Sequence, residues 1–148
     1  MKMKIVENAE CIIQSVKDNG GFGDRLVQMG VLPGSRLKII RVGFRRSTVE
    51  VMIDAGQSIA LRSKELEMLD CKLISVPLSA LNTEPGEKYK VIRFTGGQGF
   101  ILKMQERNIN ILDIFEIIED HPFELKTGKG VITIGRGEAE KIIVEPVD

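Results

Sequence analysis

The chain has 148 residues, of which 43% are hydrophobic and 28% charged, a composition typical of a folded globular protein rather than a disordered or fibrous one. Its formal net charge of zero argues against nucleic acid as the main partner, because nucleic-acid-binding proteins usually carry a strongly basic surface. The longest uncharged apolar run, Leu73–Leu81, is far shorter than the roughly 20 residues that a helix needs to cross a bilayer, so we expect no membrane span.

The first half of the chain predicts a small β-rich module. A strand is expected at Cys11–Val16, where β-branched residues are frequent. After a glycine-rich turn, Phe22, Leu26 and Met29 recur at the spacing of one face of a two-turn helix. Three strands, a short turn and a last strand are expected in order at Arg36–Val42, Thr48–Ile53, Gln57–Arg62, Ser63–Leu66 and Met68–Val76. Five short strands with one helix predict a closed barrel, which leaves few exposed strand edges.

The second half of the chain repeats the pattern of the first. A shift of 78 positions places Cys11–Ile40 over Tyr89–Ile118 without a gap, and a shift of 73 continues the match beyond a loop of different length. The matched pairs of similar character include Leu26/Met104, Val31/Ile109, Leu37/Phe115, Leu61/Ile134 and Glu65/Glu138. We interpret the chain as two related modules in tandem, each mainly β with one short helix after its first strand, which is Lys88–Phe94 in the second copy.

The predicted boundaries are residues 1–76 for the first module and 87–148 for the second. A linker is expected at 77–86, where prolines and small polar residues favour turns. The modules carry opposite charge: residues 1–76 have 12 Lys and Arg against 9 Asp and Glu, which gives +3, and residues 77–148 have 9 against 12, which gives −3.

One segment of the first module carries a family pattern. Residues 25–34 read RLVQMGVLPG, and after alternating apolar residues, residues 59–62 read IALR. This pattern resembles the FeoA family of ferrous iron uptake proteins, over residues 8–76. The resemblance implies an SH3-like barrel, a cytoplasmic location, and action on FeoB, the membrane iron permease with a cytosolic GTP-binding domain. Related domains lie at the C-terminus of metal-dependent repressors of the DtxR type.

The residues expected to shape a partner-binding surface are those of this helix and turn: Arg25, Leu26, Met29, Gly30, Pro33 and Gly34. Apart from the resemblance, these residue types are suited to closing a helix, making a tight turn and filling a core. The matched residues of the second copy are Lys103, Arg107, Ile111 and Leu112 at the positions of Arg25, Met29, Pro33 and Gly34. We therefore interpret its turn as rebuilt and the second module as a diverged relative.

Candidate metal ligands are few. Cys11, Cys71 and His121 are the only cysteine and histidine residues, and no spacing typical of a zinc or iron site occurs. Because the first and last strands of such barrels often pair, we expect Cys11 and Cys71 to lie close together. Bound Fe²⁺ or another transition metal is an open alternative. Two cysteines and no secretory signal also favour a reducing compartment, in agreement with a cytoplasmic location.

Charge is distributed differently in the two copies. A predicted strand and hairpin of the first module carries the basic residues Lys38, Arg41, Arg45 and Arg46. In the second module, the positions matched to residues 41 and 42 in the repeat are the acidic Glu119 and Asp120. A charged run is usually a solvated face. If the basic run is functional, it docks the two modules or steers the protein towards an acidic partner surface.

The sequence contains no combination of nucleophile and base, so we predict that the protein is not an enzyme. The leading hypothesis is an accessory protein of ferrous iron uptake whose first module binds the cytosolic part of a FeoB-type permease. One alternative is a metal-responsive regulatory or protein-binding module, like the SH3-like domain of DtxR-type repressors. Another is self-association, in which the +3 module of one chain pairs with the −3 module of another.

Overall fold

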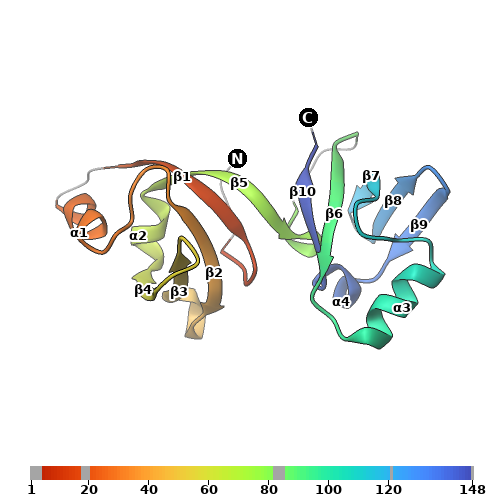
Figure 1. The fold of residues 1–148 in the computed structure, drawn as a ribbon, viewed down its shortest axis with the longest axis horizontal. Coiled ribbons are helices and arrows are strands. Elements are labelled where there is room, and N and C mark those ends of the chain that lie inside the picture. Colours follow the sequence, from red (N-terminus) through yellow and green to blue (C-terminus); the bar gives the residue numbers. More distant parts are fainter. Residues whose placement is uncertain (1–4, 18–20, 82–85, 121, 148) are drawn as a thin grey trace. The chain divides into compact units, whose positions relative to one another are not determined.

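The computed structural model describes residues 5–17, 21–81, 86–120 and 122–147 of the chain. The chain divides into two compact units, Met1–Ile74 and Ser75–Asp148, each built mainly of strands (Figure 1). The predicted linker, 77–86, lies within the second unit, where Leu78–Ala80 forms a 3₁₀ helix (η2) and residues 82–85 are outside the described part. The mainly-β fold of two modules is confirmed, and each has a short helix after its first strand.

The first unit is an antiparallel sheet with the strand order β4-β3-β2-β1-β5, interrupted by short helices. Its elements are β1 (Glu10–Val16), α1 (Phe22–Gln28), β2 (Arg36–Val42), the 3₁₀ helix η1 (Phe44–Arg46), β3 (Thr48–Ile53), β4 (Ser58–Arg62), α2 (Ser63–Glu67) and β5 (Leu69–Pro77). The first and last strands are neighbours, as the sequence predicted. The division between the units falls within β5, after Ile74.

The second unit has the same order of elements. These are β6 (Lys88–Phe94), α3 (Gln98–Glu106), β7 (Ile114–Asp120), β8 (Phe123–Thr127), β9 (Gly130–Ile134), α4 (Arg136–Ala139) and β10 (Ile142–Pro146). The strand order is β10-β6-β7-β8-β9, so β6 to β10 correspond to β1 to β5. Val76 and Pro77, at the end of β5, pair with Val144 and Ile143 of β10.

The cores of the two units use matched positions. The buried pairs, none of them more than 3% exposed, are Cys11/Tyr89, Ile13/Val91, Leu26/Met104, Val31/Ile109, Leu37/Phe115, Ile39/Ile117 and Leu61/Ile134. Both units also have a β-bulge at the next position, since the register shifts between Ile39 and Arg41 and between Ile117 and Glu119. Ile40 and Ile118, also matched in sequence, directly follow the buried Ile39 and Ile117, so strand alternation turns them to the other face and they are not in the buried set.

Two features differ from the sequence prediction. The segment predicted as a short turn, Ser63–Leu66, is the helix α2, and α4 is its counterpart in the second unit. Helix α3 has nine residues against seven in α1, and it begins two matched positions earlier.

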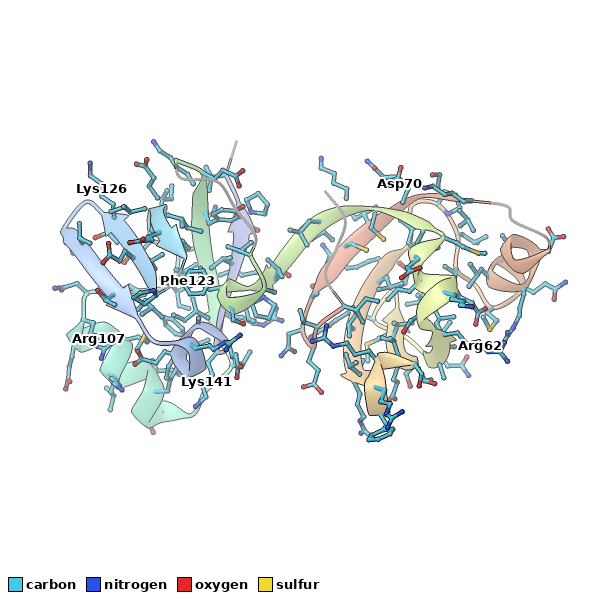
Figure 2. The ribbon with its side chains drawn as sticks, turned by 180° about the vertical axis from the view of Figure 1, so that it is seen from behind. Arg62, Asp70, Arg107, Phe123, Lys126 and Lys141 are labelled. Atoms are coloured by element: carbon cyan, nitrogen blue, oxygen red, sulfur yellow. The ribbon has the colours of Figure 1, made fainter. Side chains whose placement is uncertain are left out.

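Phe100 of α3 packs edge-on against Phe94 and lies 2.8 Å from where a Cβ on Gly96 would be, so only glycine fits there. Nζ of Lys141, a residue labelled in Figure 2, lies over this ring, 5.3 Å from its centroid.

None of the helices in the described residues has both the length and the apolar character that crossing a bilayer requires.

Candidate functional site

The six predicted partner-binding residues form one continuous helix–turn segment in the first unit. Arg25 and Leu26 lie in α1, Met29 ends the helix, and Gly30, Pro33 and Gly34 belong to the turn that leads to β2. Leu26 is fully buried and Met29 is half-buried, whereas the other four are exposed. The segment therefore contributes both to the core and to the surface of the unit.

Gly30 closes α1 in the left-handed conformation, with φ of 88°. Its N–H donates to the carbonyl oxygen of Val27 at 3.0 Å, and the N–H of Val31 donates to that of Leu26 at 2.9 Å. This pair of hydrogen bonds is the Schellman motif, in which two otherwise unpaired carbonyl groups of the last helical turn are satisfied. Leu26 and Val31, joined by the second bond, are both buried, which anchors the end of the helix in the core.

The turn is fixed to the first strand by two further backbone hydrogen bonds. The N–H of Gly34 donates to the carbonyl oxygen of Ile13 at 2.7 Å, and the N–H of Ile13 donates to that of Ser35 at 2.9 Å. Gly34 has φ of 90°, a conformation that a residue with a Cβ adopts only at a cost. The helix–turn segment is thus held at both ends by main-chain contacts.

The second unit keeps the same backbone, so the prediction that its turn is rebuilt is wrong. Asn108 closes α3 with φ of 62°, and Leu112 takes the place of Gly34 with φ of 73°. The N–H of Leu112 donates to Val91 at 2.7 Å, and the N–H of Val91 donates to Asp113 at 2.9 Å, as at the matched positions of the first unit. The hydrogen bonds to β6 involve only main-chain atoms, so they do not require a particular side chain at position 112. They keep Leu112 in a left-handed conformation that is strained for a residue with a Cβ.

A glutamate ties the first helix of each unit to the second. In the first unit, Glu65 of α2 has only 2% of its side chain exposed. Its Oε1 accepts the N–H of Arg62 at 3.1 Å, which caps the start of α2, and lies 3.5 Å from Nη1 of Arg25 in α1. Its Oε2 is buried without a hydrogen-bond partner among the described residues. A buried carboxylate is costly unless it is paired, so Arg25 has a structural role besides any contact with a partner.

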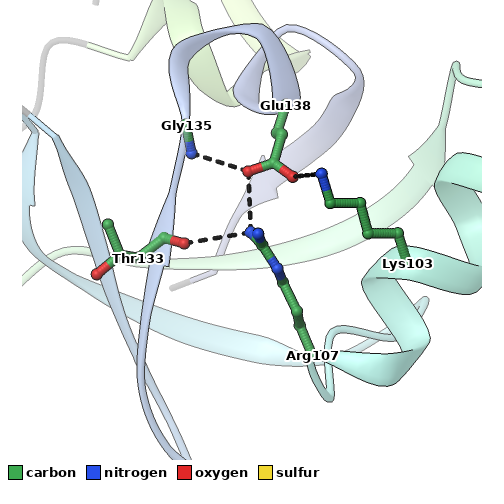
Figure 3. A network of polar contacts seen from close by, with 5 residues as sticks. All are labelled: Lys103, Arg107, Thr133, Gly135 and Glu138. Atoms are coloured by element: carbon green, nitrogen blue, oxygen red, sulfur yellow. Dashed lines mark hydrogen bonds and ion pairs between the residues drawn. The ribbon is translucent and has the colours of Figure 1, made fainter.

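Glu138 of α4 makes the matched contacts in the second unit, with two cations in place of one (Figure 3). Its Oε1 accepts the N–H of Gly135 at 3.0 Å and lies 2.9 Å from Nη1 of Arg107, and its Oε2 lies 3.0 Å from Nζ of Lys103. Partial burial acts to raise the pKa of Glu138, but the Gly135 hydrogen bond, Lys103 and Arg107 together hold it below its ordinary value.

Sequence comparison paired Glu65 with Glu138 and Arg25 with Lys103, but it did not predict that these pairs are in contact. A signal was available, because each copy keeps a cation at the first position and a glutamate at the second. Arg107 could not have been anticipated from the first copy, where Met29 occupies the matched position.

The surface of the helix–turn segment differs between the units. Val27 and Leu32 are 46% and 44% exposed in the first unit, where they flank the predicted residues, and the matched residues of the second unit are the polar Gln105 and Asn110. From α3 to the start of β7 in the second unit, the exposed apolar side chains are instead Leu102, Ile111, Leu112 and Ile114. The sequence analysis did not predict that Val27 and Leu32 are exposed at this surface. For Val27 a signal was available, because it is an apolar residue that lies off the buried Leu26 face of α1.

Cys11 and Cys71 lie on the neighbouring strands β1 and β5, and both thiols are free. The hydrogen bond from the Cys11 thiol to the Cys71 sulfur raises the pKa of Cys11, and burial adds to this effect. The same hydrogen bond lowers the pKa of Cys71, although burial acts in the opposite direction. No three His, Cys, Asp or Glu side chains of the described residues gather so as to hold a metal ion. The third candidate ligand, His121, lies outside the described residues.

Known proteins resemble both halves of the chain. The family model for the FeoA domain matches it twice, at residues 4–72 and 76–146. The solution structure of iron(II) transport protein A from Clostridium thermocellum matches 98% of this chain and 86% of its own, with 22% identity and a TM-score of 0.60, so the two share a fold. No curated protein matches the chain.

Two crystal structures show weaker likeness. An iron uptake regulatory protein (FeoA) matches 51% of this chain and 100% of its own, with 26% identity and a TM-score of 0.45. ScaR with bound Zn²⁺ matches 88% of this chain and 55% of its own, with 15% identity and the same TM-score. The double family match confirms the predicted resemblance and the tandem SH3-like fold.

The glutamate contact predicts a pH-dependent contribution to stability. Because the folded pKa of Glu138 is lowered, its contribution is complete above the unfolded value near 4.5 and is lost as the pH falls through the folded pKa. We expect Glu138→Gln to lower the free energy of unfolding by about 1 kcal/mol at pH 7 and by less at pH 3, in urea titrations. Glu140→Gln, on the same turn of chain, is the control. Equal effects of the two substitutions at pH 7 would contradict the role of Glu138.

The strained turn predicts a stabilising substitution. Leu112 is 66% exposed and left-handed, so Leu112→Gly removes strain and little buried surface. We expect it to raise the free energy of unfolding by about 1 kcal/mol, measured by urea titration. Leu112→Ala keeps the backbone strain and should give no such gain. If alanine stabilises as much as glycine, the exposed side chain and not the backbone is the cause.

Proposed function

The chain belongs to the FeoA family, whose members are small accessory proteins of iron transport and not enzymes, and from that premise we propose that it is a non-enzymatic cytoplasmic accessory protein of ferrous iron uptake. Its first module binds the cytosolic domain of a FeoB-type permease, for which Fe²⁺ is the cargo. The contact surface is the helix–turn segment formed by Arg25, Leu26, Met29, Gly30, Pro33 and Gly34, together with the exposed side chains of Val27 and Leu32.

The observation that carries this proposal is the combination of a fixed backbone with an exposed apolar surface in that segment. Two hydrogen bonds close α1 at Gly30, two more join the turn to β1, and Glu65 holds Arg25. Val27 and Leu32 are nevertheless about half exposed. A surface that is already ordered loses little conformational entropy when a partner binds, which favours affinity.

The second module has the same backbone frame but a different surface at the matched positions. Polar Gln105 and Asn110 replace Val27 and Leu32, and Arg107 replaces Met29. The second module exposes apolar side chains at other positions of this frame, Leu102, Ile111 and Leu112, so the particular arrangement proposed for the first module is not duplicated. We assign the permease contact to the first module.

A titration of isotope-labelled protein with the isolated cytosolic domain of the permease tests this assignment. We expect the largest amide shifts at residues 25–34, with little change at the matched residues 103–112. Val27→Glu places a charge in the apolar surface and should weaken binding about tenfold or more. The matched control is Gln105→Glu, which should leave the affinity unchanged.

Two results would reject the proposal. One is the absence of shifts anywhere in the chain at saturating permease domain. The other is a set of shifts confined to the second module, with Val27→Glu and Gln105→Glu having the same small effect.

A second candidate function is a metal-responsive regulatory module, favoured by the contact between Cys11 and Cys71. Two thiolates are ligands that suit soft and borderline cations, but a stable site needs further donors. Titration with Zn²⁺ or Fe²⁺ under anaerobic conditions should shift the resonances of β1 and β5 if this function holds. The double substitution Cys11→Ser and Cys71→Ser should then abolish the response, and an unchanged metal affinity would reject these ligands.

A further inference from the structure

The β2–β3 hairpin of the first unit ends in an exposed aromatic and basic tip. Phe44 is 83% exposed, and the guanidinium of Arg45 lies 5.2 Å from the centroid of its ring. Arg45 and Arg46 both have positive φ, 54° and 56°, which is uncommon for consecutive non-glycine residues. Within the described residues, neither arginine forms an ion pair, so their charge is available to a partner.

Beside this tip, β4 leaves one side of its backbone open. In the described residues β4 pairs only with β3. Hydrogen bonds at Ile53/Gln57 and at Ser47/Ser63 fix the alternation of the ladder. Bonded and non-bonded pairs alternate in antiparallel sheets, so Ile59 and Leu61 bond to β3. The N–H and C=O groups of Ser58 and Ala60 therefore point to the open side.

A pocket of about 310 Å³ lies against the same part of the sheet. It is lined by Arg41, Gly43, Thr48, Glu50, Ser58, Ile59 and Ala60. Arg41, Glu50 and Ala60 are cross-strand neighbours on β2, β3 and β4, so they form a row across its floor. Arg41 is held only loosely by Glu50, at 3.8 Å, and a competing carboxylate could take that place.

The matched surface of the second unit lacks these features. Its hairpin has Glu119 directly across from Glu124, where the first unit has Arg41 across from Glu50. At the open edge of β9, the carbonyl oxygen of Thr133, matched to Ala60, lies 3.5 Å from Nη1 of Arg107 (Figure 3). A cation over a strand edge hinders the addition of another strand. The first unit has Met29 at the position of Arg107, and its edge has no such cover in the described residues.

We propose that the first module has a second interaction surface, at which an extended acidic segment of another protein adds as a strand to β4. Its main chain bonds to Ser58 and Ala60, and its carboxylates lie on the face of the sheet that carries Arg41, near Arg45 and Arg46. Because side chains alternate along a strand, the apolar residues between them lie on the opposite face, which at this edge carries the half-buried Ile59. Charge complementarity favours an acidic occupant, because the hairpin is basic. Among the residues that line the pocket, the one acidic side chain is Glu50, which already lies beside Arg41. This surface is separate from the helix–turn segment assigned to the permease.

The probe is a blocked nine-residue peptide in which glutamate and valine alternate, added to the isotope-labelled full chain at low salt. We expect shifts and slower hydrogen exchange at the amides of Ser58 and Ala60. Ala60→Pro removes the outward N–H at a position where an edge strand tolerates proline, and it should abolish binding. The matched control in the second unit, Thr133→Pro, should bind the peptide as the unsubstituted protein does.

A second variant tests the charge without altering the strand. Arg45→Asn with Arg46→Asn removes both charges, and asparagine tolerates the left-handed backbone. It should weaken binding about tenfold at low salt. Equal binding of a peptide with lysine in place of glutamate would overturn the proposal, as would shifts at residues 25–34 instead of 58–60. Shifts at Ser58 and Ala60 that depend on protein concentration without peptide would identify a second copy as the occupant and reject the acidic partner.

Discussion

The structure of each unit depends on a glutamate at the start of its second short helix. Glu65 and Glu138 each accept the backbone N–H that begins this helix and pair with a cation from the first helix. One carboxylate thus joins two helices that are separated by three strands in the chain. Because the glutamate is buried or half-buried, breaking its contact with the cation would leave an unpaired charge away from water. This cost fixes the position of the first helix relative to the second.

On this shared frame the two units present different surfaces. The Schellman motif, the left-handed turn and the β-bulge recur at matched positions. The two copies therefore share a backbone in which even individual hydrogen bonds correspond. The side chains that face solvent differ: the first unit has Arg41 across from Glu50 where the second has Glu119 across from Glu124, and Gln105 of the second unit is matched to Val27 of the first. Backbone geometry is set by contacts that tolerate many side chains, whereas binding is set by the side chains themselves, so function can diverge while the fold does not.

Much of the fold could be predicted from the sequence because apolar periodicity and the duplication report directly on the core. The strand at Thr48–Ile53 was predicted residue for residue, and the neighbouring first and last strands were anticipated. The turn of the second unit could not be predicted, since Leu112 has no intrinsic preference for positive φ and is held there by bonds to Val91. The open edge of β4 could not be predicted either. It depends on the register of the β3–β4 ladder and on which elements lie beside β4, and local residue types determine neither of these.

One backbone frame of helix closure, turn and bulge recurs in both units, and it presents different exposed side chains in each. The most direct measurement is NMR of scalar couplings across hydrogen bonds, together with the intraresidue amide-to-Hα contacts that report a left-handed residue. The account predicts a coupling from the Leu112 amide to the Val91 carbonyl like that from Gly34 to Ile13, with left-handed signatures at Asn108 and Leu112. A negative φ at Leu112 and no coupling to Val91 would contradict it.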